Sequence, residues 1–288
     1  MIFLLLAILG SALIPVVFRA FADWRVNVFW AIPINYLTCI FVGGVWGGDA
    51  LALVYMPSRP WLWLAMLQGA ILAVNFFLLA YTAQRAGVSV AALASRLSVA
   101  IPSLLAFLIY RDTLSVIKLL GLAAALLSLY LCTVSTEGKA PARLFGSRFL
   151  PILVFLSFGC YFVVIKYAQA RYLRETSFHA YVMSGFLFAF LTSVAICLAR
   201  NRRVLQQFRW LFALAGLLLG VVNYAAVYAL VRALALDGWQ SSQLLPIYSV
   251  GVIAVSSLLA VLLFRETLSR QKTVGLAIGA AAVVLLNQ

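Results

Sequence analysis

Residues 103–131 read SLLAFLIYRDTLSVIKLLGLAAALLSLYL, and residues 257–285 read SLLAVLLFRETLSRQKTVGLAIGAAAVVL. The two stretches align without gaps at a shift of 154 residues, with 14 of 29 positions identical. Leu and Ala matches are common by chance in apolar sequences, so the repeat depends on the other matched pairs: Arg111/Arg265, Thr113/Thr267, Ser115/Ser269, Lys118/Lys272 and Gly121/Gly275. Upstream, the stretch from Asn75 is similar to the stretch from Asn223. The sequence therefore indicates two duplicated halves.

The composition indicates what kind of protein is duplicated. Of the 288 residues, 66% are hydrophobic and 10% are charged, whereas a soluble domain carries about 25% charged and about 45–50% apolar residues. Such a chain has too little polar surface to form a water-soluble globule. A helix needs about 20 apolar residues to cross a bilayer, so the chain has room for about ten such helices. We predict an all-α, polytopic membrane protein and exclude a soluble enzyme.

Charges and turn residues divide the chain into apolar runs with mostly short loops. The predicted transmembrane helices span 2–21, 27–46, 61–83, 88–110, 115–134, 150–169, 178–199, 209–231, 239–264 and 269–287. A longer connecting loop at 135–149 separates a first five-helix repeat at 1–134 from a second at 150–288. Because five is odd, the second repeat must enter the membrane in the opposite direction. Ten transmembrane helices in two inverted-topology repeats are typical of secondary transporters. A duplication that only builds a stable bundle is the alternative.

Small residues spaced four apart allow helices to pack closely in a membrane. The tenth predicted helix carries Gly275 and Gly279, and the fifth carries Gly121 and Ala125 at the matching positions. The fifth and tenth helices are therefore expected to pack on each other, a structural feature without a role in binding.

The formal charge of +14 comes from 21 Lys and Arg against 7 Asp and Glu. The basic residues lie mostly between apolar runs, as the positive-inside rule expects, so we expect no nucleic-acid partner. Loops after odd-numbered helices hold thirteen: Arg19, Arg25, Arg85, Lys139, Arg143, Arg148, Arg200, Arg202, Arg203, Arg209, Arg265, Arg270 and Lys272. The other side holds seven: Arg59, Arg111, Lys118, Lys166, Arg171, Arg174 and Arg232. This excess predicts cytoplasmic odd-numbered loops and both termini outside.

Each half closes with a helix, a short turn and a last helix that contains glycine. The turns are Arg111–Ser115 and Arg265–Ser269, and Pro102 and Pro246 lie in the fourth helix of each half. With these features the whole chain resembles the EamA-type branch of the drug/metabolite transporter superfamily. That family usually has Gly before the acidic residue of the turn, and both turns here have Arg instead.

The resemblance implies a ten-helix carrier that exchanges small metabolites, amino acids or drugs without ATP hydrolysis. The absence of a Walker sequence from the chain agrees with this. The resemblance also implies that both termini lie inside. This conflicts with the charge count, which we follow.

Arg96 lies about eight residues into the fourth predicted helix, about 12 Å from its start at 1.5 Å per residue. Ionisable residues at such depth are costly and point to function. Ser89, Ala92, Ala100 and Ser103 share its helical face and leave room beside it. We predict that Arg96 faces a central cavity and binds a carboxylate or phosphate bidentately. A structural arginine that reaches the interface or helix-end carbonyls is the alternative.

Amides and phenols at related positions of the two halves are further candidate substrate-binding residues. Asn75 and Asn223 are repeat partners, and Tyr81 and Tyr228 are roughly so. The asparagines fit hydrogen bonding to a substrate, and they equally fit interhelical hydrogen bonds worth about 1 kcal/mol each. The tyrosines fit cavity walls or interfacial anchors. Asn35 in the second helix is a weaker candidate of the same kind.

The start of the ninth helix supplies candidates for the second side of the site. Trp239, Gln243 and Pro246 fall on one helical face, expected opposite Arg96, although an interfacial helix cap explains this polar run nearly as well. Pro102 and Pro246 each remove a backbone donor and so predict helix breaks. Such breaks are tolerated in a membrane where a cavity or a neighbouring helix satisfies the backbone.

The acidic residues all fall in loops or at helix ends: Asp23, Asp49, Asp112, Glu137, Glu175, Asp237 and Glu266. The embedded acid that small multidrug-resistance proteins use to exchange protons for cationic drugs thus has no counterpart, which disfavours a carrier of lipophilic cations. The four cysteines form no CxxC pair, and no His/Cys/Asp cluster or nucleophile–base pair is visible. We therefore expect no metal, no cofactor and no enzymatic activity.

Together these observations predict a secondary transporter for a small anionic or zwitterionic metabolite, amino-acid-like as the first choice, with alternating access to a midplane site. We expect a multi-pass protein of the bacterial cytoplasmic (inner) membrane, in contact with lipid, as a monomer or homodimer. A lipid-headgroup flippase and a non-transporting membrane scaffold are the alternatives. A flippase would need a lateral opening for acyl chains, and a scaffold would close its polar stripes against one another.

Overall fold

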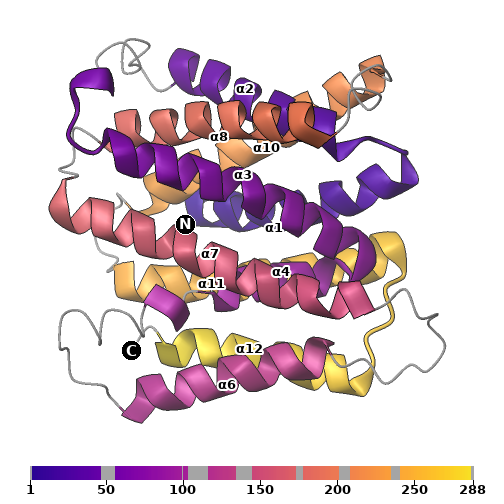
Figure 1. Ribbon diagram of the computed structural model, residues 1–288. Coiled ribbons are helices and arrows are strands. Elements are labelled where there is room, and N and C mark those ends of the chain that lie inside the picture. The colour runs from indigo at the N-terminus through magenta and orange to yellow at the C-terminus, as the bar shows by residue number, and fades with distance from the viewer. Residues whose placement is uncertain are drawn as a thin grey trace. The chain divides into compact units, whose positions relative to one another are not determined.

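The computed structural model describes residues 2–46, 56–98, 100–102, 116–133, 145–172, 178–200, 208–234 and 241–286. These residues form ten α-helices and one short 3-10 helix, and Figure 1 shows how the helices follow one another along the chain. The first half contributes α1 (Ile2–Asp23), α2 (Val28–Trp46), η1 (Met56–Ser58), α3 (Leu62–Arg85), α4 (Val88–Leu97) and α6 (Val116–Thr133). The second contributes α7 (Phe145–Arg171), α8 (Phe178–Arg200), α10 (Trp210–Leu234), α11 (Ser241–Phe264) and α12 (Arg270–Leu286). The predicted all-α fold with ten helices is confirmed.

Most predicted boundaries agree within a few residues, and two regions differ. α7 begins at Phe145, so the last five residues of the predicted connecting loop are helical. The charge of Arg148 predicts a loop, but polar residues are tolerated in a first turn at the membrane surface. The fourth predicted helix, 88–110, is described as α4 and a helical stretch at 100–102, separated by a turn at Ser98. Positions 103–110 lie outside the described residues.

The chain forms two compact units. Unit 1 comprises Met1–Arg19, Leu78–Gly159 and Ala225–Gln288, and unit 2 comprises Ala20–Phe77 and Cys160–Tyr224. Each unit takes segments from both predicted halves, and α1, α3, α7 and α10 each have residues in both units. The predicted repeats at 1–134 and 150–288 therefore describe how the sequence is duplicated, and they do not coincide with the two compact units. The limits of the repeats stay a prediction.

Equivalent helices of the two halves pack on each other within the units. In unit 1, α4 packs on α11 and α6 packs on α12, and in unit 2, α2 packs on α8. Between α4 and α11 the contacts are Val88–Ala260 and Arg96–Tyr248. Between α6 and α12 they are Ser128–Gly275 and Cys132–Lys272. Between α2 and α8 they are Phe29–Cys197 and Gly43–Met183. In each pair the numbers rise on one helix as they fall on the other. Equivalent helices of the two halves are thus antiparallel, as an inverted repeat requires.

The close packing predicted for the fifth and tenth helices is confirmed, and Figure 1 shows α6 and α12 side by side. A Cβ atom on Gly275 would lie 2.6 Å from Cys132 Sγ, and one on Gly279 would lie 2.6 Å from Ser128 Oγ. The Ser128 hydroxyl also donates a hydrogen bond to the Gly275 carbonyl at 2.6 Å. Small residues and an interhelical hydrogen bond therefore hold this pair together.

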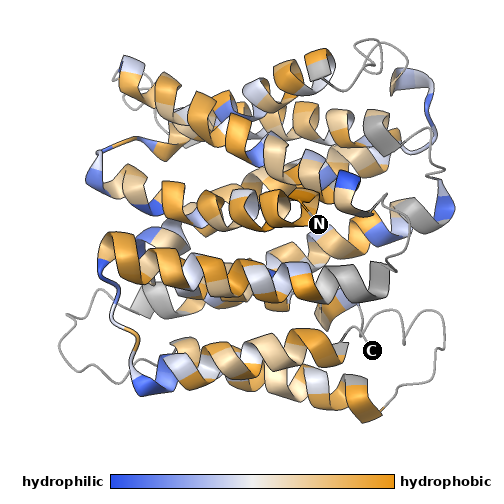
Figure 2. Ribbon diagram, turned by 180° about the vertical axis from the view of Figure 1, so that it is seen from behind, coloured by the Kyte–Doolittle hydropathy of each residue, from blue (hydrophilic) through white to orange (hydrophobic). Residues whose placement is uncertain are grey.

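Large apolar side chains face outward along the helices, and Figure 2 shows how apolar residues dominate their length. Leu120 and Leu126 of α6 and Trp210 and Leu214 of α10 are among the exposed ones. Soluble monomers rarely expose so much apolar surface. Among the described residues, seven helices are long and apolar enough to cross a membrane: α1, α2, α3, α7, α8, α10 and α11. The prediction of a multi-pass membrane protein is confirmed.

Candidate functional site

α4 is enclosed by protein on every side. Nine of its ten residues are buried, and Arg96 alone keeps a partly exposed side chain. Ser89 and Ala92, which precede Arg96 on the same face, are 1% and 2% exposed. The other residues of α4 are thus packed against protein on every side of the helix. This disfavours the alternative in which Arg96 extends through lipid to the interface.

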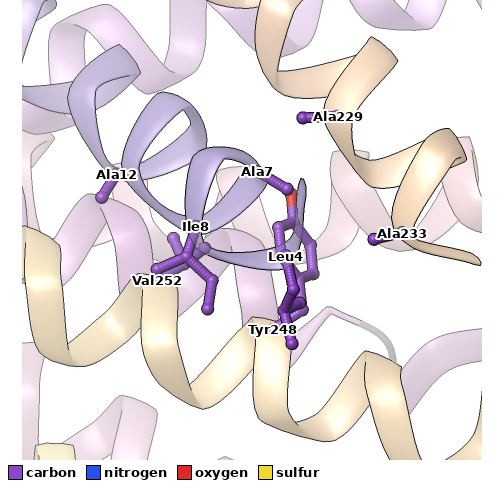
Figure 3. Close-up of a cluster of buried hydrophobic side chains, with 8 residues drawn as sticks. All are labelled: Leu4, Ala7, Ile8, Ala12, Ala229, Ala233, Tyr248 and Val252. Carbon is purple, nitrogen blue, oxygen red and sulfur yellow. The ribbon is translucent and has the colours of Figure 1, made fainter. Parts of the chain in front are cut away.

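The guanidinium group of Arg96 lies over the ring of Tyr248 in α11, with Cζ 4.7 Å from the ring centroid. The Tyr248 hydroxyl shares a 2.6 Å hydrogen bond with Ser11 Oγ of α1. Figure 3 shows Tyr248 in a buried cluster with Leu4, Ala7, Ile8, Ala12, Ala229, Ala233 and Val252. A desolvated cation–ring contact is worth about 2 kcal/mol or more. Tyr248 therefore fixes the guanidinium in place without neutralising its charge.

Among the residues that the structure describes, no carboxylate is paired with Arg96. In the described part of unit 1 the one acidic residue is Glu266, and its carboxylate accepts a hydrogen bond from the Val88 N–H. Arg96 Nε is buried and has no hydrogen-bond partner among the described residues. Arginine stays charged in proteins, and an unmet buried donor costs about 1–3 kcal/mol. The arrangement is therefore suited to accept an anion.

Asn223 of α10 forms hydrogen bonds within the protein. Its Nδ2 donates to Asn35 Oδ1 at 3.2 Å and to Cys39 Sγ at 3.5 Å, both on α2. The Cys39 thiol donates in turn to the Gly220 carbonyl at 3.4 Å. A Cβ atom on Gly220 would lie 2.5 Å from Thr38 Cβ, so α10 and α2 are in close contact here. For Asn223 the structure favours an interhelical hydrogen bond over substrate contact.

Asn75 of α3 differs from its repeat partner. It is fully buried, and neither atom of its amide has a hydrogen-bond partner among the residues described. Gln68, two turns earlier on α3, is also buried with an unpartnered Oε1. Such groups are rare in native proteins and call for a functional or bound-water explanation. Asn75 thus stays a candidate for substrate binding. It belongs to unit 2, whereas Arg96 belongs to unit 1.

Tyr81 and Tyr228 lie at the ends of equivalent helices, α3 and α10. Each ring lies beneath an exposed arginine one turn later, with Arg85 Cζ 5.1 Å from the Tyr81 centroid and Arg232 Cζ 5.5 Å from the Tyr228 centroid. Arg232 Nε also donates to the Tyr228 hydroxyl at 3.0 Å. Paired aromatic and basic residues at helix ends are typical of membrane interfaces. The geometry favours interfacial anchors over cavity walls.

The fourth helix is interrupted near Pro102. α4 ends at Leu97, and the Ser98 carbonyl accepts a hydrogen bond from the Ile101 N–H at 3.1 Å, three residues later. In a continuous helix that carbonyl would accept from residue 102, but proline has no N–H. The proline therefore accounts for the break just beyond Arg96.

The remaining candidates are on or before α11. Trp239 lies outside the described residues. Gln243 and Pro246 belong to α11, but their side chains are outside the described part of the chain. Their place opposite Arg96 stays a prediction.

Sequence reasoning missed the contacts of Tyr248, Ser11 and Glu266. Tyr248 is one of 12 tyrosines. It lies in an apolar helix, where an aromatic residue gives no sign of a particular contact. Glu266 was recognised within the repeated turn, but its hydrogen-bond partner Val88 is 178 residues away in sequence. The matched turn marked Glu266 as a residue to examine, although no local pattern named its partner.

Residues 147–288 match the EamA-like transporter family. The second half of the chain belongs to that family. The resemblance seen in the sequence is thus confirmed, and the protein is a transmembrane transporter of the drug/metabolite transporter superfamily.

Two similar proteins cover nearly the whole EamA-type chain. An uncharacterised protein of Haemophilus influenzae is 24% identical over 292 residues, which are 98% of this chain and 96% of that protein. A protein of known crystal structure is 17% identical and has a TM-score of 0.55, covering 99% of this chain and 94% of its own. The second likeness shows a shared fold.

Proposed function

We propose that the protein is a secondary transporter for a small anionic or zwitterionic metabolite, amino-acid-like as the first choice. The observation that carries the proposal is Arg96, whose guanidinium is held by Tyr248 on an enclosed helix without a carboxylate partner among the described residues of unit 1. Charged residues at membrane depth are retained where a partner or a transport pathway accounts for them. An anionic group of the solute supplies that partner.

Arg96 would bind the solute through the edge of its guanidinium, because the ring of Tyr248 occupies one face. An arginine edge offers two parallel N–H donors to a carboxylate or phosphate, which the ammonium group of lysine cannot match. The unpartnered amide of Asn75 is proposed as a separate hydrogen-bonding contact for an uncharged polar group of a solute. Gln243 and Trp239 are proposed for the opposite wall.

The antiparallel packing of equivalent helices supports alternating access by rocking of the two repeats. α11 continues through Pro246 from Ser241 to Phe264, so the break predicted there is not present. The helix break near Pro102 is proposed as the point where this movement bends the fourth helix of the first half. We place the protein in the bacterial inner membrane, as a monomer or homodimer. No ATP hydrolysis is required, because solute gradients drive exchange in such carriers.

The test is counterflow into liposomes that contain purified protein, with amino acids, simple carboxylates, phosphorylated metabolites and a soluble phospholipid headgroup as the competing solutes. Arg96→Ala is expected to abolish counterflow of the anionic solute and its thermal shift. Arg96→Lys is expected to lose about tenfold in affinity, because a charge-assisted bidentate contact is lost. Arg232→Ala, which removes an exposed arginine from a tyrosine ring, is the matched control and should behave like the unaltered protein.

The proposal is wrong if folded Arg96→Ala protein transports the same anions at the unaltered rate. It is also wrong if only cations or uncharged solutes show counterflow. Competition by the phospholipid headgroup alone would direct the function to lipid movement instead.

A further inference from the structure

The acidic residue of the second turn motif contacts the start of the helix that carries Arg96. Arg265, the residue directly after α11, has a φ of 50°. The Glu266 N–H then donates a hydrogen bond to the Ala260 carbonyl at 3.2 Å. This turn folds the chain back over the end of α11. Glu266 Oε2 then accepts a 3.1 Å hydrogen bond from the N–H of Val88, the first residue of α4.

Gly87 leaves room for that carboxylate. Its φ is +105°, and a Cβ atom at this position would overlap Glu266 Oε1. Gly87 is the N-cap of α4 and has no side chain to cap the helix. Glu266 therefore supplies from the other half of the chain what a serine or aspartate N-cap supplies locally, an anionic acceptor at the positive end of the helix dipole.

Further side-chain contacts hold the same end of unit 1. They join α1, the α3–α4 turn and the end of α11: the buried cluster of Val16, Val88 and Ala260, the hydrogen bond from Gln84 Nε2 to the Phe18 carbonyl at 2.9 Å, and Arg19 Cζ at 5.4 Å from the Phe264 centroid. Three separate segments are thus connected beside the start of α4. The charge count places these odd-numbered loops in the cytoplasm.

α4 is built to move as a short rigid piece. It has ten residues, with the glycine of positive φ before it and the break at Ser98 after it. Its start is held by the packing of Val88 with Val16 and Ala260 and by one polar contact, the hydrogen bond to Glu266 Oε2. The other oxygen, Oε1, is buried and unpartnered among the described residues. Water can replace such a bond when the two turns separate. By contrast, the glycine-mediated contact of α6 with α12 is continuous packing.

We propose that Glu266 is the latch of a gate at this end of the Arg96 site. In the described conformation the latch holds α4, and with it Arg96, and closes the end formed by the α3–α4 and α11–α12 turns. Breaking the bond to Val88 frees α4 and opens that end. The inference rests on the proposed function for its role in transport, but the position of the gate is independent of the solute.

The test measures how fast a membrane-impermeant thiol reagent labels a cysteine placed one turn before Arg96, as Ala92→Cys, from the side of the α3–α4 turn. The background carries Cys160→Ser, because Cys160 is the exposed cysteine and the other three are buried. Glu266→Ala is expected to raise the labelling rate about tenfold, the effect of losing one helix cap. Glu266→Gln keeps an acceptor oxygen and should raise it less. Thr267→Ala, an exposed neighbour in the same turn, should leave it unchanged.

Labelling of the Glu266→Ala protein at the unaltered rate overturns the latch. Because unfolding of the Glu266→Ala protein would also raise the labelling rate, a second measurement closes the gate instead. A short bifunctional thiol reagent that bridges Val88→Cys and Ala260→Cys, which lie in one buried cluster, should stop labelling of Ala92→Cys, and cleavage of the bridge should restore it. Unchanged labelling of the bridged protein also overturns the proposal. Neither readout needs a substrate, so loss of the anion site in Arg96→Ala leaves the gate test intact.

Discussion

The Asn223 side chain donates a hydrogen bond to Asn35 Oδ1 at 3.2 Å, buried between α10 and α2. Its repeat partner Asn75 is equally buried, yet neither amide atom has a partner among the described residues. Duplication placed an asparagine in both halves, and the surroundings then gave the two residues different roles. The difference can be measured.

Asn223→Leu is expected to lower the free energy of unfolding by about 1–3 kcal/mol, because Asn35 and Cys39 lose their partner in a buried place. Asn75→Leu removes an amide without a partner, so its thermal midpoint should stay level or rise. Thermal unfolding in detergent compares the two. Equal destabilisation by the two substitutions would show that Asn75 also forms a stabilising interhelical hydrogen bond. A lower transport rate in folded Asn75→Leu alone would support a role in solute binding.

Tyr248 is expected to act on Arg96 through its ring rather than its hydroxyl. Tyr248→Phe removes the hydrogen bond to Ser11 and keeps the ring, so affinity for the anionic solute should fall by no more than about tenfold. Tyr248→Leu removes a cation–ring contact worth about 2 kcal/mol and should weaken binding about thirtyfold. Ser11→Ala is the control, and its affinity should equal that of Tyr248→Phe. If Phe and Leu weaken binding equally, the hydroxyl and not the ring positions Arg96.

The interface of α6 with α12 should tolerate no larger side chain at Gly275. Gly275→Val would overlap Cys132, and overpacking of this kind destabilises by about 1–3 kcal/mol. Gly44 is the matched control in α2, since nothing lies within 4 Å of a Cβ atom there. Gly44→Ala should be neutral or stabilising by about 0.5–1 kcal/mol, because glycine weakens a helix interior. A stable Gly275→Val protein would contradict the packing.

The exposed pair of Tyr228 and Arg232 is expected to anchor the helix end without contributing to binding. Tyr228→Leu should lower stability by about 0.5–1 kcal/mol, the value of an exposed cation–ring contact. The dissociation constant of the solute should not change. A titration that shows weaker binding with unchanged stability would return Tyr228 to the wall of the site.

The helices could be predicted almost completely, because the thickness of the bilayer fixes their length and each apolar run is visible locally. α7 begins five residues before its predicted start, because the charge of Arg148 indicates a loop. Arg96 was visible because a charge stands out in an apolar run. The contacts of Arg96 with Tyr248, and of Glu266 with Val88, were not visible, because each joins helices of different halves. Asn75 and Asn223 are equivalent in the sequence repeat, but the sequence does not show which side chains surround each of them in space.

The antiparallel pairing of α2 with α8, α4 with α11 and α6 with α12 has a consequence for energetics. Exchanging the roles of the two halves converts one end of such a protein into the other, so conformations open to either side are near images. They differ in free energy only where the halves differ in sequence or in packing, as the unlike surroundings of Asn75 and Asn223 illustrate. Under the proposed function, the fold itself then carries no preferred direction, and the solute's own gradient decides which way net transport runs.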